Sequence, residues 1–362
     1  MAIENGLVVT PIDMSDVDGW VFLAEVRRQR VETCLRTHLD GLDLPPDLSR
    51  QIGEWATQLK MKAMSCAVVT REAWAALDAA GIDALVIKGI ALSVQTTGYV
   101  VSRGPGDIDV WVRPDHVGAA VVVLEELGYR VGASTVRPDV PSWRGRYTRW
   151  LAFEMQMERS GTPLDLHWHL SAARHGLPTF TEAWDNRTHV DIGGTPVATL
   201  SAEHAFVHSC SHAHRDGWGW LRSLIDIDRL SRLVPHEGAT ASFSRAFRLS
   251  AAMAYDVTAS PSLLPWISTK RSAVTRARRI ASTNQAKSGW AVSGAWTLKS
   301  TWDWLSQHLQ LAGDGGDMAR VLSGFVLPPE FLVDAPTRRP VSLLHALSAR
   351  VGKAYRRITH RD

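Results

Sequence analysis

Three aspartates have the type and spacing to hold metal ions. Asp107 and Asp109 stand two residues apart in the alternating segment 107–112, and Asp165 stands in a second alternating segment, 163–170. Side chains on a strand alternate between faces, so Asp107 and Asp109 should point the same way. Carboxylates this close repel one another unless a positive group compensates them. If the two strands are neighbours, the three aspartates predict a site for two divalent ions, Mg²⁺ or Mn²⁺.

Such a site suits displacement at phosphorus. Two ions held by carboxylates polarise the α-phosphate of a nucleotide, shield the leaving pyrophosphate and help to activate an attacking hydroxyl. Catalysis of this kind depends on positioning and electrostatics rather than on a covalent intermediate. Asp107 and Asp109 are expected to bind the ions, and Asp165 to complete the site and help to activate the acceptor.

A glycine turn stands upstream of the aspartate pair. The apolar segment 84–88 predicts a buried strand that ends at Lys88-Gly89, and a helix is expected directly afterwards. Backbone N–H groups at a helix N-terminus bind phosphate, and Gly89 would let the backbone approach it closely. Arg103, in the glycine-rich loop 102–106, is a second predicted phosphate contact.

The surrounding pattern predicts an α+β fold. Strands are expected at 84–88, 107–112, 151–159 and 163–170, the last two as a hairpin, with a smaller hairpin at 189–200. Helical patterns precede and follow this part. We expect four units, a helical lead-in, an α/β core, a helical domain and a basic tail, at 1–69, 70–200, 201–335 and 336–362.

These residues resemble the nucleotidyltransferase superfamily, the polymerase-beta-like fold, and within it the branch called "nucleotidyltransferase family protein". The resemblance covers most of residues 50–235. It is carried by Gly81-Ile82, Ile87-Lys88-Gly89, Arg103, Gly106-Asp-Ile-Asp109, Gly128-Tyr129, Asp165-Leu-His-Trp168, the segment 208–214 and the segment 220–228. It implies a mixed sheet with flanking helices, followed by a C-terminal helical domain.

The sequence departs from that family at the turn. The superfamily usually has Gly-Ser or Gly-Gly, whereas this chain has Gly89-Ile90, and 17 residues separate Gly89 from Asp107, which is longer than usual. The phosphates must therefore be held differently, and Lys88, Ser93 and Arg103 are the residues expected to do so.

The resemblance implies transfer of a nucleoside monophosphate, with AMP from ATP as the first expectation, to a hydroxyl acceptor that the sequence does not identify. That acceptor is a small molecule, a peptide or protein side chain, or an RNA end, as in a toxin-like tRNA nucleotidyltransferase. The alternative from another class is a catalytically inactive module that binds a nucleotide or a partner on the same scaffold. A hydrolase built on the histidine-rich helix is a more distant alternative.

Several histidines and helical aspartates have more than one interpretation. His167 shares a strand face with Asp165 and is a metal neighbour, a general base or, as favoured here, a hydrogen-bonded support for the ligands. His208, His212 and His214 lack the glutamate of an H-E-x-x-H motif, so packing or lining of a cleft is expected rather than metal binding. Two further aspartates, Asp226 and Asp228, are expected to cap their helix or to pair with Arg222 and Arg229.

Composition limits the classes of partner. The formal net charge is +3, too small to argue for nucleic acid, although residues 336–362 carry seven lysines or arginines against one acid. Cys34, Cys66 and Cys210 are sparse and odd in number, which favours a reducing compartment. The N-terminal residues lack a signal pattern, and no long apolar run exists. We therefore expect a cytoplasmic protein with no membrane partner, and nucleic acid as a less favoured one.

Overall fold

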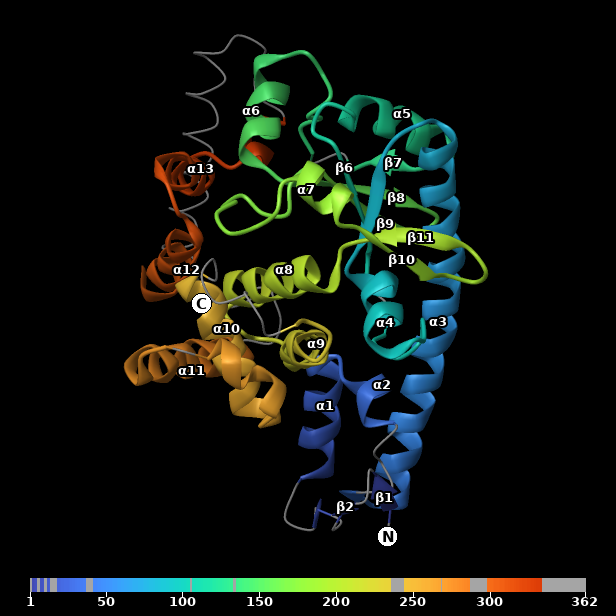
Figure 1. Ribbon diagram of the computed structural model, residues 1–362, viewed down its shortest axis with the longest axis vertical. Helices are drawn as coiled ribbons and strands as arrows, with labels where there is room; N and C mark the ends of the chain where they lie inside the picture. Colours follow the sequence, from blue (N-terminus) through green and yellow to red (C-terminus); the bar gives the residue numbers. More distant parts are fainter. Residues whose placement is uncertain are drawn as a thin grey trace, which may run out of the picture.

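The computed structural model describes residues 2–4, 7–9, 12–13, 18–36, 42–104, 106–132, 135–235, 244–267, 269–286 and 298–333. The expected basic tail at 336–362 lies outside these residues. The longest helix, α3 (Pro46–Ala79), runs along one side of the molecule (Figure 1), with proline in its first turn where a missing N–H costs nothing. It passes residue 69 without interruption, so the predicted boundary between lead-in and core falls inside one helix.

A five-stranded mixed sheet forms the centre of the core, in the order β5-β6-β9-β8-β7. The strands are β5 (Ala84–Ile87), β6 (Ile108–Val112), β7 (Arg130–Val131), β8 (Glu154–Arg159) and β9 (Thr162–His167). β6 and β9 are parallel, and the other neighbours are antiparallel. The expected hairpin of β8 and β9 is present, and the α+β fold with a mixed sheet is confirmed.

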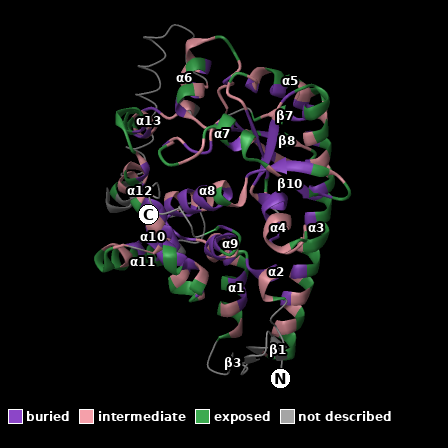
Figure 2. Ribbon diagram, in the orientation of Figure 1, coloured by how far each residue is buried: buried purple, intermediate pink, exposed green. Residues whose placement is uncertain are grey.

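One face of this sheet is wholly apolar. Ile108 and Val110 of β6 and Leu164 and Leu166 of β9 pack in one buried cluster with residues of α3 and of α5 (Val117–Glu126). Each of these four side chains is at most 3% exposed, and Figure 2 shows much of the sheet region in the purple of buried residues. Burial of large aliphatic side chains contributes about 1.5–3 kcal/mol each, so this face fixes the sheet on its helices and leaves the opposite face for polar groups.

The elements that follow the sheet in sequence begin with α7 (Phe180–Asp185), the hairpin β10 (Thr188–Asp191) and β11 (Pro196–Thr199), and α8 (Ala202–Arg215). Trp111 of the opposite face packs with α7 and α8, whereas Val190 and Val197 of the hairpin pack with α3. The helical part continues with α9 (Leu221–Ser231), α10 (Arg245–Thr258), α11 (Arg271–Ala286), α12 (Leu298–Leu311) and α13 (Gly315–Val326). A C-terminal helical region is therefore present, as expected.

Three segments differ from the sequence prediction. The beginning of the predicted helical lead-in is divided into α1 (Gly19–Gln29) and α2 (Glu32–Leu35), and between them Arg30 takes a left-handed conformation with φ of 57°. The strand expected from residue 151 begins only at Glu154, after α6 (Trp143–Leu151). The short strand β7 was not predicted either, since two residues are too few to show a period.

Candidate metal and phosphate site

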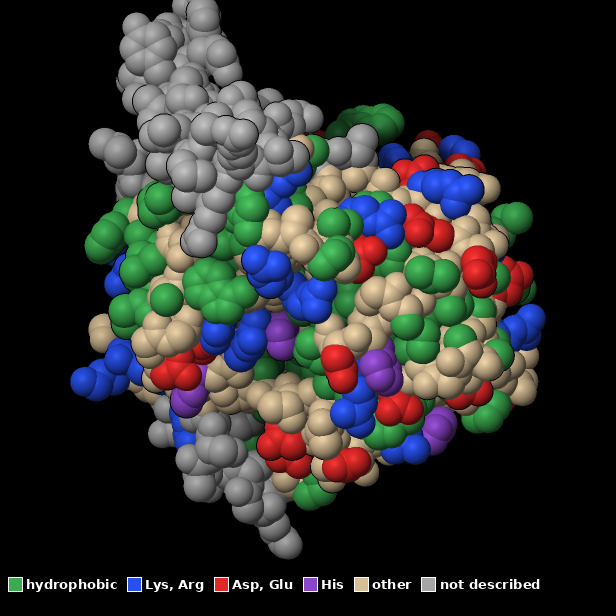
Figure 3. Space-filling view, turned by 90° about the horizontal axis from the view of Figure 1, so that it is seen from above, with side chains coloured by type: hydrophobic (Ala, Val, Ile, Leu, Met, Phe, Trp, Pro, Cys, Tyr) green, Lys and Arg blue, Asp and Glu red, His purple; other side chains and the backbone are tan. Residues whose placement is uncertain are grey.

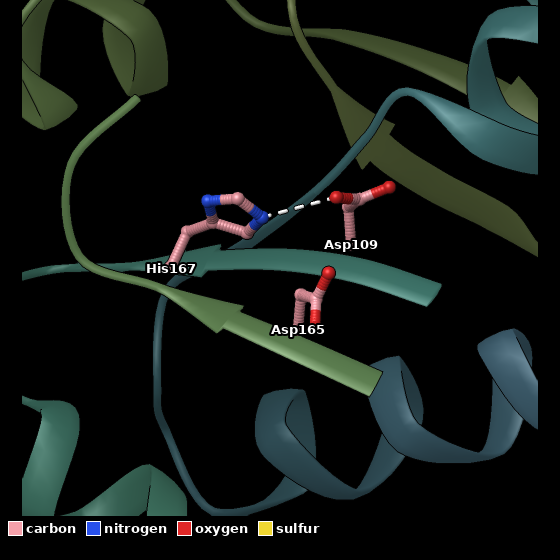
Figure 4. Close-up of side chains that lie close together, drawn as sticks. All are labelled: Asp109, Asp165 and His167. Atoms are coloured by element: carbon pink, nitrogen blue, oxygen red, sulfur yellow. Dashed lines mark hydrogen bonds and ion pairs between the residues drawn. The ribbon is translucent and has the colours of Figure 1, made fainter. Parts of the chain in front are cut away.

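Strand register brings two of the three predicted aspartates side by side. β6 and β9 pair in parallel with Asp109 opposite Asp165 and Trp111 opposite His167. Because alternate residues share a face, Asp109, Asp165 and His167 project on the same side of the sheet, as Figure 4 shows. One ligand atom from each of the three lies within 4.8 Å of the others.

Asp109 is buried, and its negative charge is compensated by neighbouring side chains. Its Oδ1 accepts hydrogen bonds from Lys88 Nζ at 3.1 Å and from His167 Nε2 at 3.0 Å. Burial opposes ionisation of this carboxyl, but the charge of Lys88 and the hydrogen bond from His167 hold its pKa well below the usual value. Asp109 is therefore a carboxylate, and its second oxygen remains available as a ligand.

Asp165 has the opposite electrostatic environment. Burial, followed by the charges of Glu154, Asp109 and Asp107, raises the pKa of Asp165 to about 8. Among the described residues, the carboxyl of Asp165 forms no ion pair, so its ionisation would add a negative charge that Lys88, already paired with Asp109, does not balance. A divalent cation would relieve that repulsion, and carboxylate oxygens suit Mg²⁺ or Mn²⁺. The residues present thus fit a metal ion.

Asp107 lies at the edge of this group. It precedes β6 and is exposed, and the cluster of close ligand atoms comprises Asp109, Asp165 and His167. Desolvation and the charge of Asp109 raise the pKa of Asp107, so the two carboxylates are electrostatically coupled. Asp107 thus stays a predicted ligand that the described structure does not bring into this cluster.

The glycine turn adopts the predicted position at the start of α4 (Gly89–Thr97). Gly89 has φ of +41°, and a Cβ there would lie 3.2 Å from the carbonyl oxygen of Asp107. Lys88, the residue before α4, also has a positive φ, of 56°. Left-handed backbone at a residue other than glycine is uncommon, and here it accompanies the ion pair that directs Lys88 to Asp109.

Two predicted phosphate contacts have protein partners. Arg103 Nε donates to Asp226 Oδ2 at 2.8 Å, and both side chains are buried. Ser93 is buried in α4, and its hydroxyl donates to the carbonyl of Tyr99 at 2.6 Å. The structure therefore brings Lys88, Asp109 and Asp165 together, whereas Ser93 and Arg103 make contacts that hold neighbouring backbone or α9.

The aspartates of α9 differ from the expected pairing. Asp226 accepts from Arg103 rather than from Arg222 or Arg229, and Asp228 pairs with Arg232 four residues further along the helix, at 2.6 Å. The partner of Asp226 lies 123 residues away in sequence, so local spacing could not reveal it.

Helix α8 supplies polar side chains opposite the sheet. His208 and His212 are electrostatically coupled to Lys88, and His208 also to His167 and Asp109. Burial holds the pKa of both histidines well below the usual value, so they are neutral near pH 7. A small pocket lies between Lys88, Gln95 of α4 and His208. Of the three histidines expected to pack or to line a cleft, His208 lines this pocket and His214 is buried against Trp218.

Two further residues near the site were not predicted from the sequence. Glu154, at the start of β8, lies 3.4 Å from His167 Nδ1, so His167 stands between two carboxylates. Arg215, the last residue of α8, stacks over Phe153 at 5.2 Å and is coupled to Glu154 and Asp109. Glu154 occupies the position opposite His167 in the β8–β9 register, and only the hairpin alignment could have indicated it.

The mixed sheet, the glycine turn and the paired carboxylates define a nucleotidyltransferase-like protein. A family model described as "Uncharacterised nucleotidyltransferase" matches residues 15–255, which is more than half of the chain. The chain therefore belongs to this family of uncharacterised nucleotidyltransferases.

Other comparisons add little. A search of curated proteins gives no match. Among solved structures, the chain is similar to an antigenic nucleotidyltransferase-like protein from Paracoccidioides brasiliensis, with 16% identity over 60% of this chain and 96% of that chain, at a TM-score of 0.34. No helix among the described residues is long and apolar enough to span a membrane.

Proposed function

We propose that this protein is a metal-dependent nucleotidyltransferase that transfers a nucleoside monophosphate, AMP from ATP as the first expectation, to a hydroxyl-type acceptor. The observation that carries the proposal is the register of β6 and β9, which sets Asp109 beside Asp165 on the face that also receives Lys88. Family membership supports the same class of reaction.

Asp109, Asp165 and, from the solvent side, Asp107 would hold divalent ions, Mg²⁺ or Mn²⁺. When bound, such ions stabilise negative charge on the phosphates and on the leaving pyrophosphate. In the reaction, the acceptor oxygen forms a bond to the α-phosphorus as the bond from that phosphorus to the bridging oxygen of pyrophosphate breaks. The proton of the acceptor hydroxyl is released, and Asp165 helps to take it up.

The other residues position the reactants. Lys88 fixes Asp109 and carries positive charge to the beginning of α4, where Gly89 allows phosphate to approach the backbone. His167 donates to Asp109 and lies against Glu154, so it orients the carboxylate rather than reacting with substrate. Arg103 would act on phosphate through guanidinium nitrogens other than the Nε that donates to Asp226.

The acceptor is proposed only as a class. Figure 3 shows acidic and basic side chains intermixed over much of one face of the described molecule, an arrangement that does not favour a long polyanion there. A small molecule or a peptide therefore precedes an RNA end among the candidates, and a steep fall of RNA binding with salt would reverse that order.

The proposal is tested with each NTP labelled at the α-phosphate, Mg²⁺ or Mn²⁺, and a cell extract as the source of acceptor. Label should enter an acceptor with the wild-type protein and be absent with Asp109→Asn. The matched control is Asp83→Asn. Asp83 forms an ion pair with Arg113 at the end of the β5–β6 pair that lies away from Asp109. Full labelling with Asp109→Asn would refute the assignment.

A non-catalytic binding module is the alternative, and one contact favours it. Lys88 and His167 already satisfy one oxygen of Asp109 without any ion. Such a module would bind nucleotide without metal dependence and would label nothing, and its Asp109→Asn variant would keep its biological effect.

A further inference from the structure

Three arginines gather where the loop before β6 meets α1 and α9, outside the carboxylate cluster. We call Arg30, Arg103 and Arg222 the arginine cluster. They come from the end of α1, the loop before β6 and the first turn of α9. Figure 1 shows α9 close to the upper ends of α1 and α2, so segments that are distant in sequence meet here.

Direct contacts hold this junction in place. Gln29 Oε1 accepts a hydrogen bond from the backbone N–H of Leu221 at 2.6 Å, which joins the end of α1 to the beginning of α9. The guanidinium of Arg30 lies over the ring of Trp220 at 4.8 Å from its centroid. Arg30 also keeps a left-handed φ of 57°, a conformation that costs free energy at a residue other than glycine. The position of this side chain is therefore defined by the surrounding structure.

One buried donor of the arginine cluster has no protein partner. Asp226 is hydrogen-bonded to Arg103, and the charges of Arg222 and Arg30 act on Glu32. The Nε of Arg222 is buried and has no hydrogen-bond partner among the described residues. Burial and the charges of Arg103 and Arg30 lower the pKa of Arg222 to about 9. Burial of a cationic donor without a partner costs free energy, and a bound anion would remove this cost by accepting its hydrogen bond.

The cluster lies against the loop that leads to Asp107. Arg103 stands four residues before Asp107 in this loop, and Thr33 Oγ1 of α2 donates to the carbonyl of Ser102 at 3.2 Å. Arg30 and Asp107 are both exposed, so an anion can reach this position from solvent. A polyphosphate held by ions at the aspartates would thus have arginines next to it.

We propose that Arg30 and Arg222 bind the β- and γ-phosphates of the nucleotide and then the leaving pyrophosphate. This inference rests on the proposed function. Guanidinium groups bind phosphate through two parallel N–H donors, which suits a chain of phosphate oxygens better than a single point charge does. The helical lead-in, through α1, therefore supplies part of the substrate site.

The test compares ATP, AMP and inorganic pyrophosphate by calorimetric titration in the presence of Mg²⁺. Arg222→Gln and Arg30→Gln should each weaken ATP and pyrophosphate binding by about tenfold or more and leave AMP binding unchanged. Arg232→Gln is the matched control, because Arg232 lies on the same helix with a side chain 60% exposed. Arg222→Lys keeps the charge and should lose less affinity than Arg222→Gln, and thermal melting reports whether each variant is folded.

The outcomes separate this inference from the proposed function. ATP binding that is unchanged in folded Arg222→Gln and Arg30→Gln overturns the inference and leaves nucleotidyl transfer standing. Pyrophosphate binding that depends on Arg222, in a protein that binds no nucleotide, refutes the proposed function and assigns the site to phosphate on another molecule. Equal losses for ATP and AMP also overturn the inference, because they would place the arginines at the α-phosphate or the nucleoside.

Discussion

At the scale of single residues, Asp165 links the proposed metal site to stability. The unfolded chain releases the proton of this carboxyl near the ordinary pKa of 3.8, whereas the folded protein keeps it until about pH 8. Between those values the folded state binds the additional proton, so a rise in pH lowers the free energy of unfolding through this group. Asp165→Asn removes that dependence because an amide does not titrate in this range.

We therefore expect the metal-free Asp165→Asn variant to gain stability over the wild-type protein as the pH rises from 5 to 8. Urea unfolding in EDTA at both pH values measures the difference. Added Mg²⁺ should stabilise the wild type and not the variant. A stability difference that is constant with pH would contradict the raised pKa of Asp165.

Replacement of Asp109 should lower the stability of the protein rather than raise it. Asp109→Asn removes the carboxylate that compensates Lys88, and the side chains of Lys88 and Asp109 are only 16% and 9% exposed. We expect the free energy of unfolding to fall by about 1–3 kcal/mol, the usual cost of leaving a buried polar group without its partner. Chemical denaturation at pH 7 measures it. No loss would mean that Lys88 readily moves to solvent.

At the scale of elements, the turn into α4 depends on Gly89. Gly89→Ala would force a residue with a Cβ into a φ of +41° and press it against the carbonyl of Asp107. Gly98→Ala is the matched control, since Gly98 has φ of +77° and nothing within 4 Å of an added Cβ. Both should lose about 1 kcal/mol or more of stability, but only Gly89→Ala should also weaken Mg²⁺-dependent nucleotide binding. Equal binding by both variants would show that Asp107 is not displaced.

Helix α8 should make the protein sensitive to acid. His214 is fully buried against Trp218, and burial lowers its pKa to about 4. The unfolded chain binds a proton between pH 6.5 and 4 that the folded protein does not, so stability falls as the pH falls through this window. His214→Phe keeps an aromatic ring and should shift acid unfolding to lower pH, as followed by circular dichroism. A change at exposed His189 should leave the midpoint where it is.

At the scale of the whole molecule, the Arg103–Asp226 ion pair joins the sheet to the helical region. Both side chains are less than 10% exposed, so Arg103→Ala would leave an uncompensated buried carboxylate. We expect it to lower the free energy of unfolding by about 3 kcal/mol. Replacement of both residues by apolar ones should recover part of the loss.

A double-mutant cycle by urea unfolding measures the coupling between Arg103 and Asp226. Arg50→Ala serves as the control, because its pair with Asp47 is largely exposed and should contribute little. Additive effects of the Arg103 and Asp226 substitutions would show that the two parts of the molecule are not held together by this pair.

The strands and the turn that carry the site could be predicted from local sequence patterns. Alternation along 107–112 and 163–170 placed each aspartate on a polar strand face, and the glycines at 81 and 89 marked the ends of a short buried strand. These predictions succeed because the twofold period of a strand and the backbone freedom of glycine are local properties. The β8–β9 hairpin followed for the same reason.

The contacts between the site residues depend on how the elements pack in three dimensions. The parallel register that sets Asp109 against Asp165, the ion pair of Asp109 with Lys88 and the choice of Asp226 by Arg103 all join residues far apart in sequence. Such pairings result from the packing of the whole sheet on α3 and α5 and of α9 on α1, and no spacing along the chain encodes them. For that reason the sequence could name Arg103 as a phosphate contact but could not show that its Nε is held by α9.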